Sequence, residues 1–373
     1  MLEADKTQQS QSGDVDNHLD EWSEADEDEL AKINIDFLDD GCEISKFSLE
    51  CDKLLSAEGS PLQRYYRKYL TVSDFVKQYW CEQQLLYNLS PMAYLINVPP
   101  GVEVNIEESA EHKEVKEKGS DVHFARELEI QVPVEVHVVT KEDAWAVKFL
   151  NMQTMILAFH KGDRVAREVP VFGMPFGSGL FVYGIIDELQ YNPDLHTIEI
   201  LELKTRKYCV PPRKSQQDKD AFQVGLYAEL FNGLVQGLVT SEMVETQLQL
   251  KLDIPLSSDV QRHIHQQNKK RAKMKIYTCG DVLDIVLSQM QSFVVITKGT
   301  LEYVHQESSK QISTFSVPLD QEKLRRLFIQ QCEWWRGDRG TVGVDVEDCW
   351  KCNFCQFAPF CEWRAVKAAE FKH

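Results

Sequence analysis

The sequence lacks any apolar run long enough to cross a membrane. The stretches around "TMILAF" and "FVVIT" are far shorter than the roughly 20 residues that a membrane helix needs. It also lacks a visible signal peptide, and its acidic beginning is unlike a basic mitochondrial transit peptide. We therefore expect an intracellular protein with no membrane contact. No internal repeat is visible, so a repeat architecture is not expected.

Basic residues are in short supply, since 41 Lys and Arg stand against 59 Asp and Glu, for a net charge of -18. Residues 1–43 contain fifteen acidic residues and two lysines, and so account for -13 of this charge. This stretch has little apolar periodicity, and we predict a disordered acidic tail over residues 1–45. It either solvates the protein or binds a partner by mimicking nucleic acid. Residues 46–373 are predicted to form a single domain.

Hydrophobic spacing predicts a mixture of helices and strands. A helix is expected over 71–89, with Ser73 as its N-cap and Cys81 lying on it. Further helices are expected over 119–132, 141–160 and 220–235, from residue 281, and from 320 to about 335. Strands are expected over 132–139, 165–173, 180–190 and 197–207, and around "LEYVHQ" and "TFSVPL". The stretch "QRHIHQQNKKRAKMK" is expected to be a basic loop. Together these elements predict an α/β fold.

Charged residues end two neighbouring strands of this pattern. Asp187 follows "YGII", while Glu202 and Lys204 lie on one face of the strand "TIEILELKT". If the two strands pair, the carboxylates of Asp187 and Glu202 approach each other and need a cation between them. Two hard oxygen ligands suit Mg²⁺ or Mn²⁺, beside which Lys204 can orient or deprotonate a water. An E-x-K triplet alone is weak evidence, because an exposed Glu–Lys pair has the same pattern.

Other polar residues support this site by their spacing. Gln223 and Tyr227 are four residues apart and share one helical face, although Tyr227 could simply fill the core. Upstream, His123 and Glu127 also share a helical face. A lone histidine is more often a packed or surface residue than a ligand, so only the combination of these residues with the charged strand ends indicates a site.

The order Gly-x-x-x-His-x-x-x-Glu, Gly-x-x-Asp, Glu-x-Lys and Gln-x-x-x-Tyr resembles the RecB-type branch of the PD-(D/E)xK nucleases. The resemblance implies that His123, Asp187, Glu202 and the backbone carbonyl of Leu203 hold the metal and that Lys204 handles the water. It also implies that Gln223 and Tyr227 support the site and that Arg206 meets a DNA phosphate.

The C-terminal part is dense in cysteine: Cys349, Cys352, Cys355 and Cys361 lie in "CWKCNFCQFAPFCEW". This density predicts a metal site. Zinc sites usually pair two separated C-x-x-C knuckles, whereas iron–sulfur clusters use four thiolates and tolerate one distant ligand. Cys81 is the candidate for the distant ligand, and a cluster joining it to the tail would tie the ends of the fold together. Cys349 could instead complete a local set of four.

From about Ser48 onward, the chain resembles the exonuclease V family, whose pattern C…C-x2-C-x5-C falls on Cys81, Cys352, Cys355 and Cys361. The resemblance implies a 4Fe–4S cluster that embraces a nuclease core. It further implies an Mg²⁺-dependent exonuclease that threads single-stranded DNA, releases short oligonucleotides in DNA repair, and is regulated by the single-strand-binding protein RPA. We expect a monomer located in the nucleus, with the cytosol as a second location; "KKRAK" resembles a weak nuclear import signal.

The combined hypothesis is an α/β fold with a PD-(D/E)xK nuclease core, in which a mixed central sheet is flanked by helices. A helical N-terminal part and a cysteine-rich C-terminal part would be joined by the metal cluster. The core is placed at about 108–240 and the iron–sulfur segment at 349–361. Two alternatives remain, a nuclease of the CRISPR-adaptation type and a catalytically silent nucleic-acid-binding module with a structural metal.

Overall fold

The computed structural model describes residues 59–91, 94, 98, 110–130, 134, 136–267 and 276–370. The predicted acidic tail, Cys42, Cys51 and the basic stretch 268–275 lie outside these residues. The helices are α2 (Pro61–Arg64), α3 (Val72–Trp80), α4 (Glu82–Leu89), α6 (Ala110–Leu128), α7 (Lys141–Lys161), η2 (Pro175–Gly177), α8 (Lys214–Val235), α9 (Ser241–Leu248), α10 (Ser258–Gln267), α11 (Cys279–Met290), α12 (Gln321–Arg336), η3 (Val346–Phe354), η4 (Ala358–Phe360) and α13 (Glu362–Glu370). The strands are β1 (Leu70–Thr71), β2 (Val165–Gly173), β3 (Val182–Asn192), β4 (Thr197–Arg206), β5 (Lys298–His305) and β6 (Gln311–Pro318).

The six strands form one mixed sheet in the order β1-β3-β4-β5-β6, with β2 paired to β3. Strand β3 is parallel to β1 and antiparallel to β2 and β4. Strand β5 is parallel to β4 and antiparallel to β6. The sequence therefore predicted the fold class correctly: a mixed central sheet flanked by helices.

One edge of β3 is shared by two short ladders. The ladder to β1 reaches Tyr183, and the ladder to β4 begins at Glu188, opposite Leu201. Strand β2 occupies the other edge of β3 along almost its whole length. Strands β3 and β4 therefore diverge at residues 184–187, and Asp187 lies where they separate.

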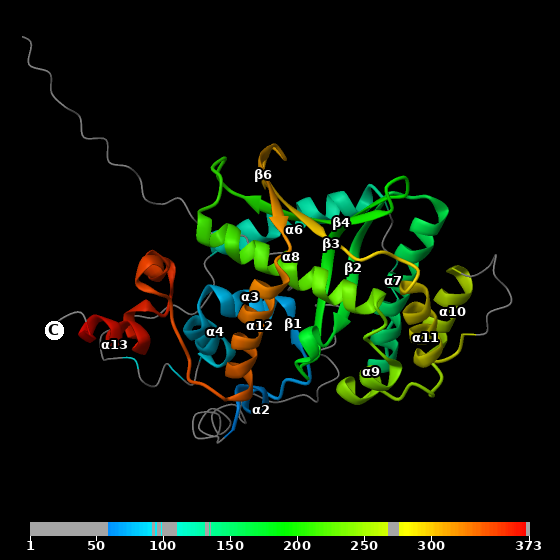
Figure 1. The fold of residues 1–373 in the computed structure, drawn as a ribbon, viewed down its shortest axis with the longest axis horizontal. Coiled ribbons are helices and arrows are strands. Elements are labelled where there is room, and N and C mark those ends of the chain that lie inside the picture. The colour runs from blue at the N-terminus through cyan, green and yellow to red at the C-terminus, as the bar shows by residue number, and fades with distance from the viewer. Residues whose placement is uncertain are drawn as a thin grey trace, which may run out of the picture.

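Helices cover the sheet, and other helices form the two ends of the molecule. Helix α8 runs across the sheet, while α3 and α12 lie against α8 (Figure 1). Helices α9, α10 and α11 gather at one end of the molecule, and α13 lies at the opposite end (Figure 1). The apolar faces of α3, α7, α8, α11 and α12 bury one continuous core with the strands.

Capping side chains define several helix starts. Thr71, Thr140 and Thr278 each accept a hydrogen bond from the backbone N–H three residues on, and the Asp at that position reciprocates. Asp320 caps α12, as its predicted start requires. Helices α7 and α12 end at Gly162 and Gly337, whose φ angles of 97° and 80° favour glycine.

The structure corrects four local predictions. The helix expected over 71–89 is two helices, because Cys81 is extended (φ -164°, ψ 107°) and separates α3 from α4; its N-cap is Thr71, not Ser73. The basic loop begins as helix α10, and α6 starts at Ala110, earlier than expected. Residues 134 and 136–139, the described part of the strand expected over 132–139, are not in a strand.

The misassigned strand has a simple physical explanation. Its Val134 and Val139 are 63% and 49% exposed, so the alternating pattern has no sheet face to cover there. Within the described ranges, no helix is both long enough and apolar enough to cross a membrane.

Candidate active site and cysteine pocket

Asp187 is held by a neighbouring strand and approached by a helix. The backbone N–H of Leu203 on β4 donates to Asp187 Oδ2 at 2.9 Å. His123 Nδ1, from α6, lies 3.9 Å from the same oxygen, and these two side chains are only 11% and 12% exposed. The Asp187 carboxylate thus bridges the gap between β3 and β4 and lies against the residue that follows Glu202.

A third residue joins this pair. Ligand atoms of His123, Asp187 and Glu168 all lie within 4.8 Å of one another, in an arrangement that could hold a metal ion. Glu168 is on β2, between residues Arg167 and Val169, which pair with Glu188 and Ile186 of β3. Its φ of 51° is unusual for a non-glycine residue within a strand. Glu168 was not predicted from the sequence. Its only indication there is that it is the single acidic residue in the strand segment "VAREVPVFG".

Glu202 and Lys204 form a buried ion pair. Lys204 Nζ lies 2.9 Å from Glu202 Oε1, and the side chains are 11% and 0% exposed. The β3–β4 register, extended one step beyond Glu188 and Leu201, sets Glu202 across from Asp187. The alternative interpretation of this triplet, an exposed Glu–Lys pair, is therefore wrong.

Helix α8 presents a polar stripe toward these strands. Gln223 Nε2 donates to Tyr227 Oη at 3.1 Å, and both residues are buried. The Tyr227 ring also packs against Gly184 of β3. Arg206 is buried too, and its Nη1 donates to Gln216 Oε1 at 3.0 Å. Its proposed contact with a phosphate therefore requires that the DNA reach a guanidinium that is 7% exposed.

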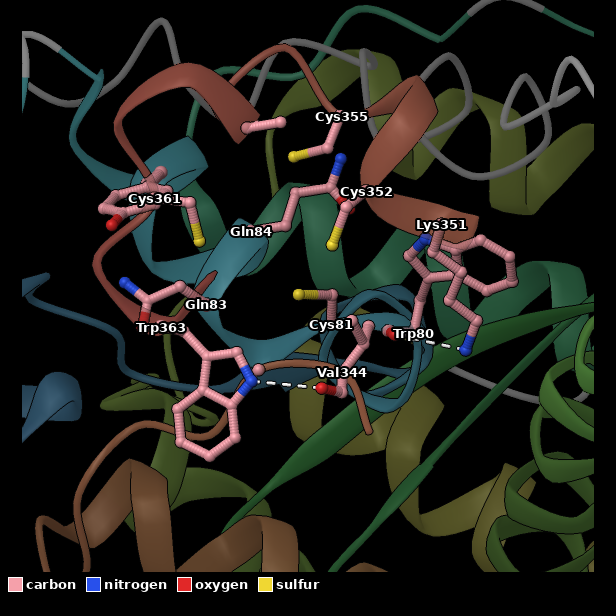
Figure 2. A pocket seen from close by; sticks show the side chains of 13 residues that line it. Trp80, Cys81, Gln83, Gln84, Val344, Lys351, Cys352, Cys355, Cys361 and Trp363 are labelled. Carbon is pink, nitrogen blue, oxygen red and sulfur yellow. Dashed lines mark hydrogen bonds between the residues drawn. The ribbon is translucent and has the colours of Figure 1, made fainter. Parts of the chain in front are cut away.

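The second candidate site is a pocket lined by the sulfur-bearing residues Cys81, Cys352, Cys355 and Cys361 (Figure 2). Three come from the C-terminal segment and Cys81 from the break between α3 and α4. Cys349 is exposed and is not among the residues that line the pocket. The structure therefore groups the distant Cys81, rather than Cys349, with the three tail cysteines.

The electrostatics of this pocket suit a bound cation. Burial, with a smaller contribution from charge repulsion by Cys361 and Cys352, raises the pKa of Cys81 to about 11. Burial likewise raises the pKa of Cys355 to about 12, with Cys81 among the residues that add to the shift. Four thiols gathered in one pocket are a suitable donor set for a soft metal or an iron–sulfur centre.

Aromatic contacts and hydrogen bonds hold the two walls of this pocket together. Trp80 packs edge-on against Trp350, and Tyr87 contacts both Phe357 and Phe360. The Glu362 N–H donates to Tyr87 Oη at 3.1 Å. Trp363 Nε1 donates to the Val344 carbonyl at 3.0 Å, as Figure 2 shows.

Comparisons with known proteins identify the family of this chain. The model of the family described as "Exonuclease V - a 5' deoxyribonuclease" matches residues 60–199, 192–278 and 282–364. Exonuclease V of Danio rerio is 35% identical over 307 residues, which are 82% of this chain and 73% of the relative. A crystal structure of SSO0001 covers 87% of this chain and 98% of its own, at 13% identity and a TM-score of 0.35.

The molecule is a nuclease, a hydrolase with a mixed α/β fold. The chain belongs to the exonuclease V family, as its sequence motifs predicted.

Proposed function

We propose that this nuclease is a metal-dependent exonuclease that hydrolyses single-stranded DNA into short oligonucleotides through a PD-(D/E)xK site. The observation that carries the proposal is the approach of His123, Glu168 and Asp187 within 4.8 Å, next to the buried Glu202–Lys204 pair. The family description as a 5′ deoxyribonuclease supports DNA as the substrate and digestion from the 5′ end. Family membership also disfavours the CRISPR-adaptation alternative.

The donor set fits Mg²⁺ or Mn²⁺. His123, Asp187, Glu202 and the Leu203 carbonyl would hold the ion, and Glu168 adds a further carboxylate. When bound, the ion would supply Lewis-acid polarisation of the phosphoryl oxygen.

The other proposed roles belong to side chains of β4 and α8. Lys204 would act as an ammonium that the Glu202 carboxylate holds at 2.9 Å, and its N–H groups would orient a water for in-line attack. Gln223 and Tyr227 support this arrangement from α8, and Arg206 provides positive charge for a phosphate near the end of β4.

The cysteine pocket is proposed to hold a 4Fe–4S cluster on Cys81, Cys352, Cys355 and Cys361, with a structural role. The convergence of these four residues on one pocket supports this choice of ligands. Residues 46–373 then form one nuclease domain, with a core at about 108–240 and the cluster segment at 349–361. A role in DNA repair, regulation by RPA, a monomeric state and a nuclear or cytosolic location rest on the family resemblance.

A digestion time course tests the catalytic proposal. Single strands labelled at either end are incubated with and without Mg²⁺, using wild type, Asp187→Ala and Lys204→Ala. We expect Mg²⁺-dependent shortening by wild type, and losses of at least about a hundredfold in both variants with DNA binding retained. Cleavage by Asp187→Ala at the wild-type rate would refute the metal site. Binding without cleavage by wild type would favour a silent nucleic-acid-binding module.

Absorption spectroscopy tests the cluster and its ligands. Protein purified without oxygen is expected to be brown, and Cys81→Ala to lose the colour. Cys349→Ala is the matched control, because its thiol lies outside the pocket, and it should keep the colour. The reverse result would transfer the fourth ligand to Cys349, and colourless protein with stoichiometric zinc would overturn the cluster.

A further inference from the structure

Helix α8 carries a buried carboxylate, Asp220, that is not among the residues assigned to the site above. Asp220 lies one turn before Gln223 and two turns before Tyr227, so the three share one helical stripe. Gln216, four residues before Asp220, continues the stripe and accepts the hydrogen bond from Arg206. Asp220 therefore lies between the Arg206 contact and the Gln223–Tyr227 pair, on the helix face turned toward β4 and β5.

The partner of Asp220 is a tyrosine next to the proposed catalytic lysine. Tyr303 on β5 donates its hydroxyl hydrogen to Asp220 Oδ2 at 2.6 Å. In the parallel β4–β5 register, Tyr303 is the partner of Lys204. Asp220 and Tyr303 are 1% and 0% exposed, so this bond is shielded from water. A short, charge-assisted bond in such surroundings is stronger than an ordinary one.

Charged side chains of both signs lie around this bond. Lys219 Nζ lies 3.4 Å from the other oxygen of Asp220. Burial and the Asp220 carboxylate raise the pKa of Tyr303, whereas the charges of Lys204 and Arg206 oppose that shift. Tyr303 is therefore a neutral hydroxyl, within electrostatic reach of both basic residues of β4, and its hydrogen is directed toward Asp220.

We propose that Asp220 and Tyr303 act together as positioning residues for Lys204. The inference deepens the proposed function and rests on the role that it gives to Lys204. With its hydrogen engaged by Asp220, the Tyr303 oxygen presents its lone pairs to the surrounding cations. The bonded pair thereby limits the conformations of the lysine side chain and holds α8 in register with β4 and β5.

This role predicts a selective effect on turnover. Tyr303→Phe removes one hydroxyl and keeps the ring, so substrate binding should be preserved while Lys204 loses its orientation. We expect kcat to fall about tenfold, with KM and the Kd for a single strand within about twofold of wild type. Asp220→Asn keeps an acceptor at the same place and should retain more activity than Asp220→Ala. Tyr303→Phe combined with Asp220→Asn should lose less than the product of the two single losses.

Asn232→Ala is the matched control. Asn232 is also buried on α8, where its amide donates to the Ile296 carbonyl at 3.0 Å and accepts from the Ile296 N–H at 2.7 Å. Its loss should weaken the packing of α8 without lowering kcat. If Asn232→Ala and Tyr303→Phe reduce kcat equally at equal loss of stability, the Asp220–Tyr303 pair is merely structural and the inference is overturned.

A second measurement does not depend on cleavage. Acetylation of Lys204 by a small anhydride, followed by mass spectrometry, should be several-fold faster in Tyr303→Phe than in wild type or Asn232→Ala. Unchanged labelling together with unchanged kcat would refute the positioning role while leaving the nuclease proposal intact. An inactive wild type would refute the nuclease proposal, and the labelling rates would still decide whether the pair restrains Lys204.

Discussion

Glu168 shows how much a single residue can depend on its backbone. Its φ of 51° lies in the left-handed region, where a non-glycine side chain in a strand costs about 1–3 kcal/mol. The neighbouring ladder pairs hold their register despite this conformation. The surrounding sheet therefore imposes it, and the result is a carboxylate beside His123 and Asp187.

Glu168→Gln tests this carboxylate as a metal ligand. The amide keeps the shape of the side chain and removes its charge, so the Mg²⁺ concentration for half-maximal cleavage should rise by about tenfold. The measurement is an Mg²⁺ titration of single-strand digestion. Glu199→Gln is the control, because Glu199 of β4 forms a solvent-accessible ion pair with Lys298 of β5. Equal Mg²⁺ dependence in the two variants would exclude Glu168 from the metal site.

At the scale of elements, the site depends on the close approach of α8 to β3. A Cβ added at Gly184 would lie 2.7 Å from the ring of Tyr227 and 2.7 Å from Val72. Only glycine allows this contact, which places Tyr227 next to the diverging part of β3. Tyr227 therefore fills the core, as one of its two interpretations predicted, and its support of the site remains a prediction.

Gly184→Ala should separate these elements. Overpacking at such a contact costs about 1–3 kcal/mol of unfolding free energy, and displacement of Tyr227 should lower kcat as well. Urea unfolding and single-strand digestion measure the two effects. Gly233→Ala on α8 is the control, because an added Cβ there meets nothing within 4 Å, and alanine should stabilise the helix by about 0.5–1 kcal/mol. Similar stability changes in the two variants would contradict the steric argument.

In the molecule as a whole, a partly buried ion pair joins the N-terminal helices to the C-terminal segment. Arg339 donates to both oxygens of Glu82, at 2.6 and 2.7 Å, and the Val342 N–H donates to Glu82 at 2.9 Å. Gln78 adds a bond of 2.6 Å. Because Glu82 follows Cys81, this cluster of bonds brings the two walls of the cysteine pocket together.

Arg339→Ala should destabilise the protein strongly. It leaves Glu82 buried with its charge uncompensated, which costs about 3–5 kcal/mol of unfolding free energy. The temperature of thermal unfolding should fall, and the visible absorbance of the proposed cluster should be lost faster on dilution. Lys298→Ala removes an ion pair whose side chains are 50% and 34% exposed, and it should cost less than about 1 kcal/mol. A comparable loss in both variants would show that the Glu82 pair does not join the ends.

Features that depend on local interactions were predicted from the sequence, whereas features that depend on distant contacts were not. Strand β2 has the predicted bounds, and the start of α12 after Asp320 was predicted, because both depend on local alternation and capping. The break at Cys81 was missed, since "QYWCEQQ" has uninterrupted helical spacing. Its extended backbone belongs to a pocket whose other wall lies more than 250 residues away in the chain.

Hydrophobic periodicity was sufficient to predict the α/β class, and the resemblance of the motifs to those of known proteins was sufficient to predict the nuclease family. Only the tertiary structure decided that Glu168 joins His123 and Asp187, that Asp220 bonds Tyr303 beside Lys204, and that Cys81 rather than Cys349 lines the pocket. Each of these results is a contact between segments distant along the chain. The packing of the sheet and helices sets such contacts, and local sequence patterns do not encode them.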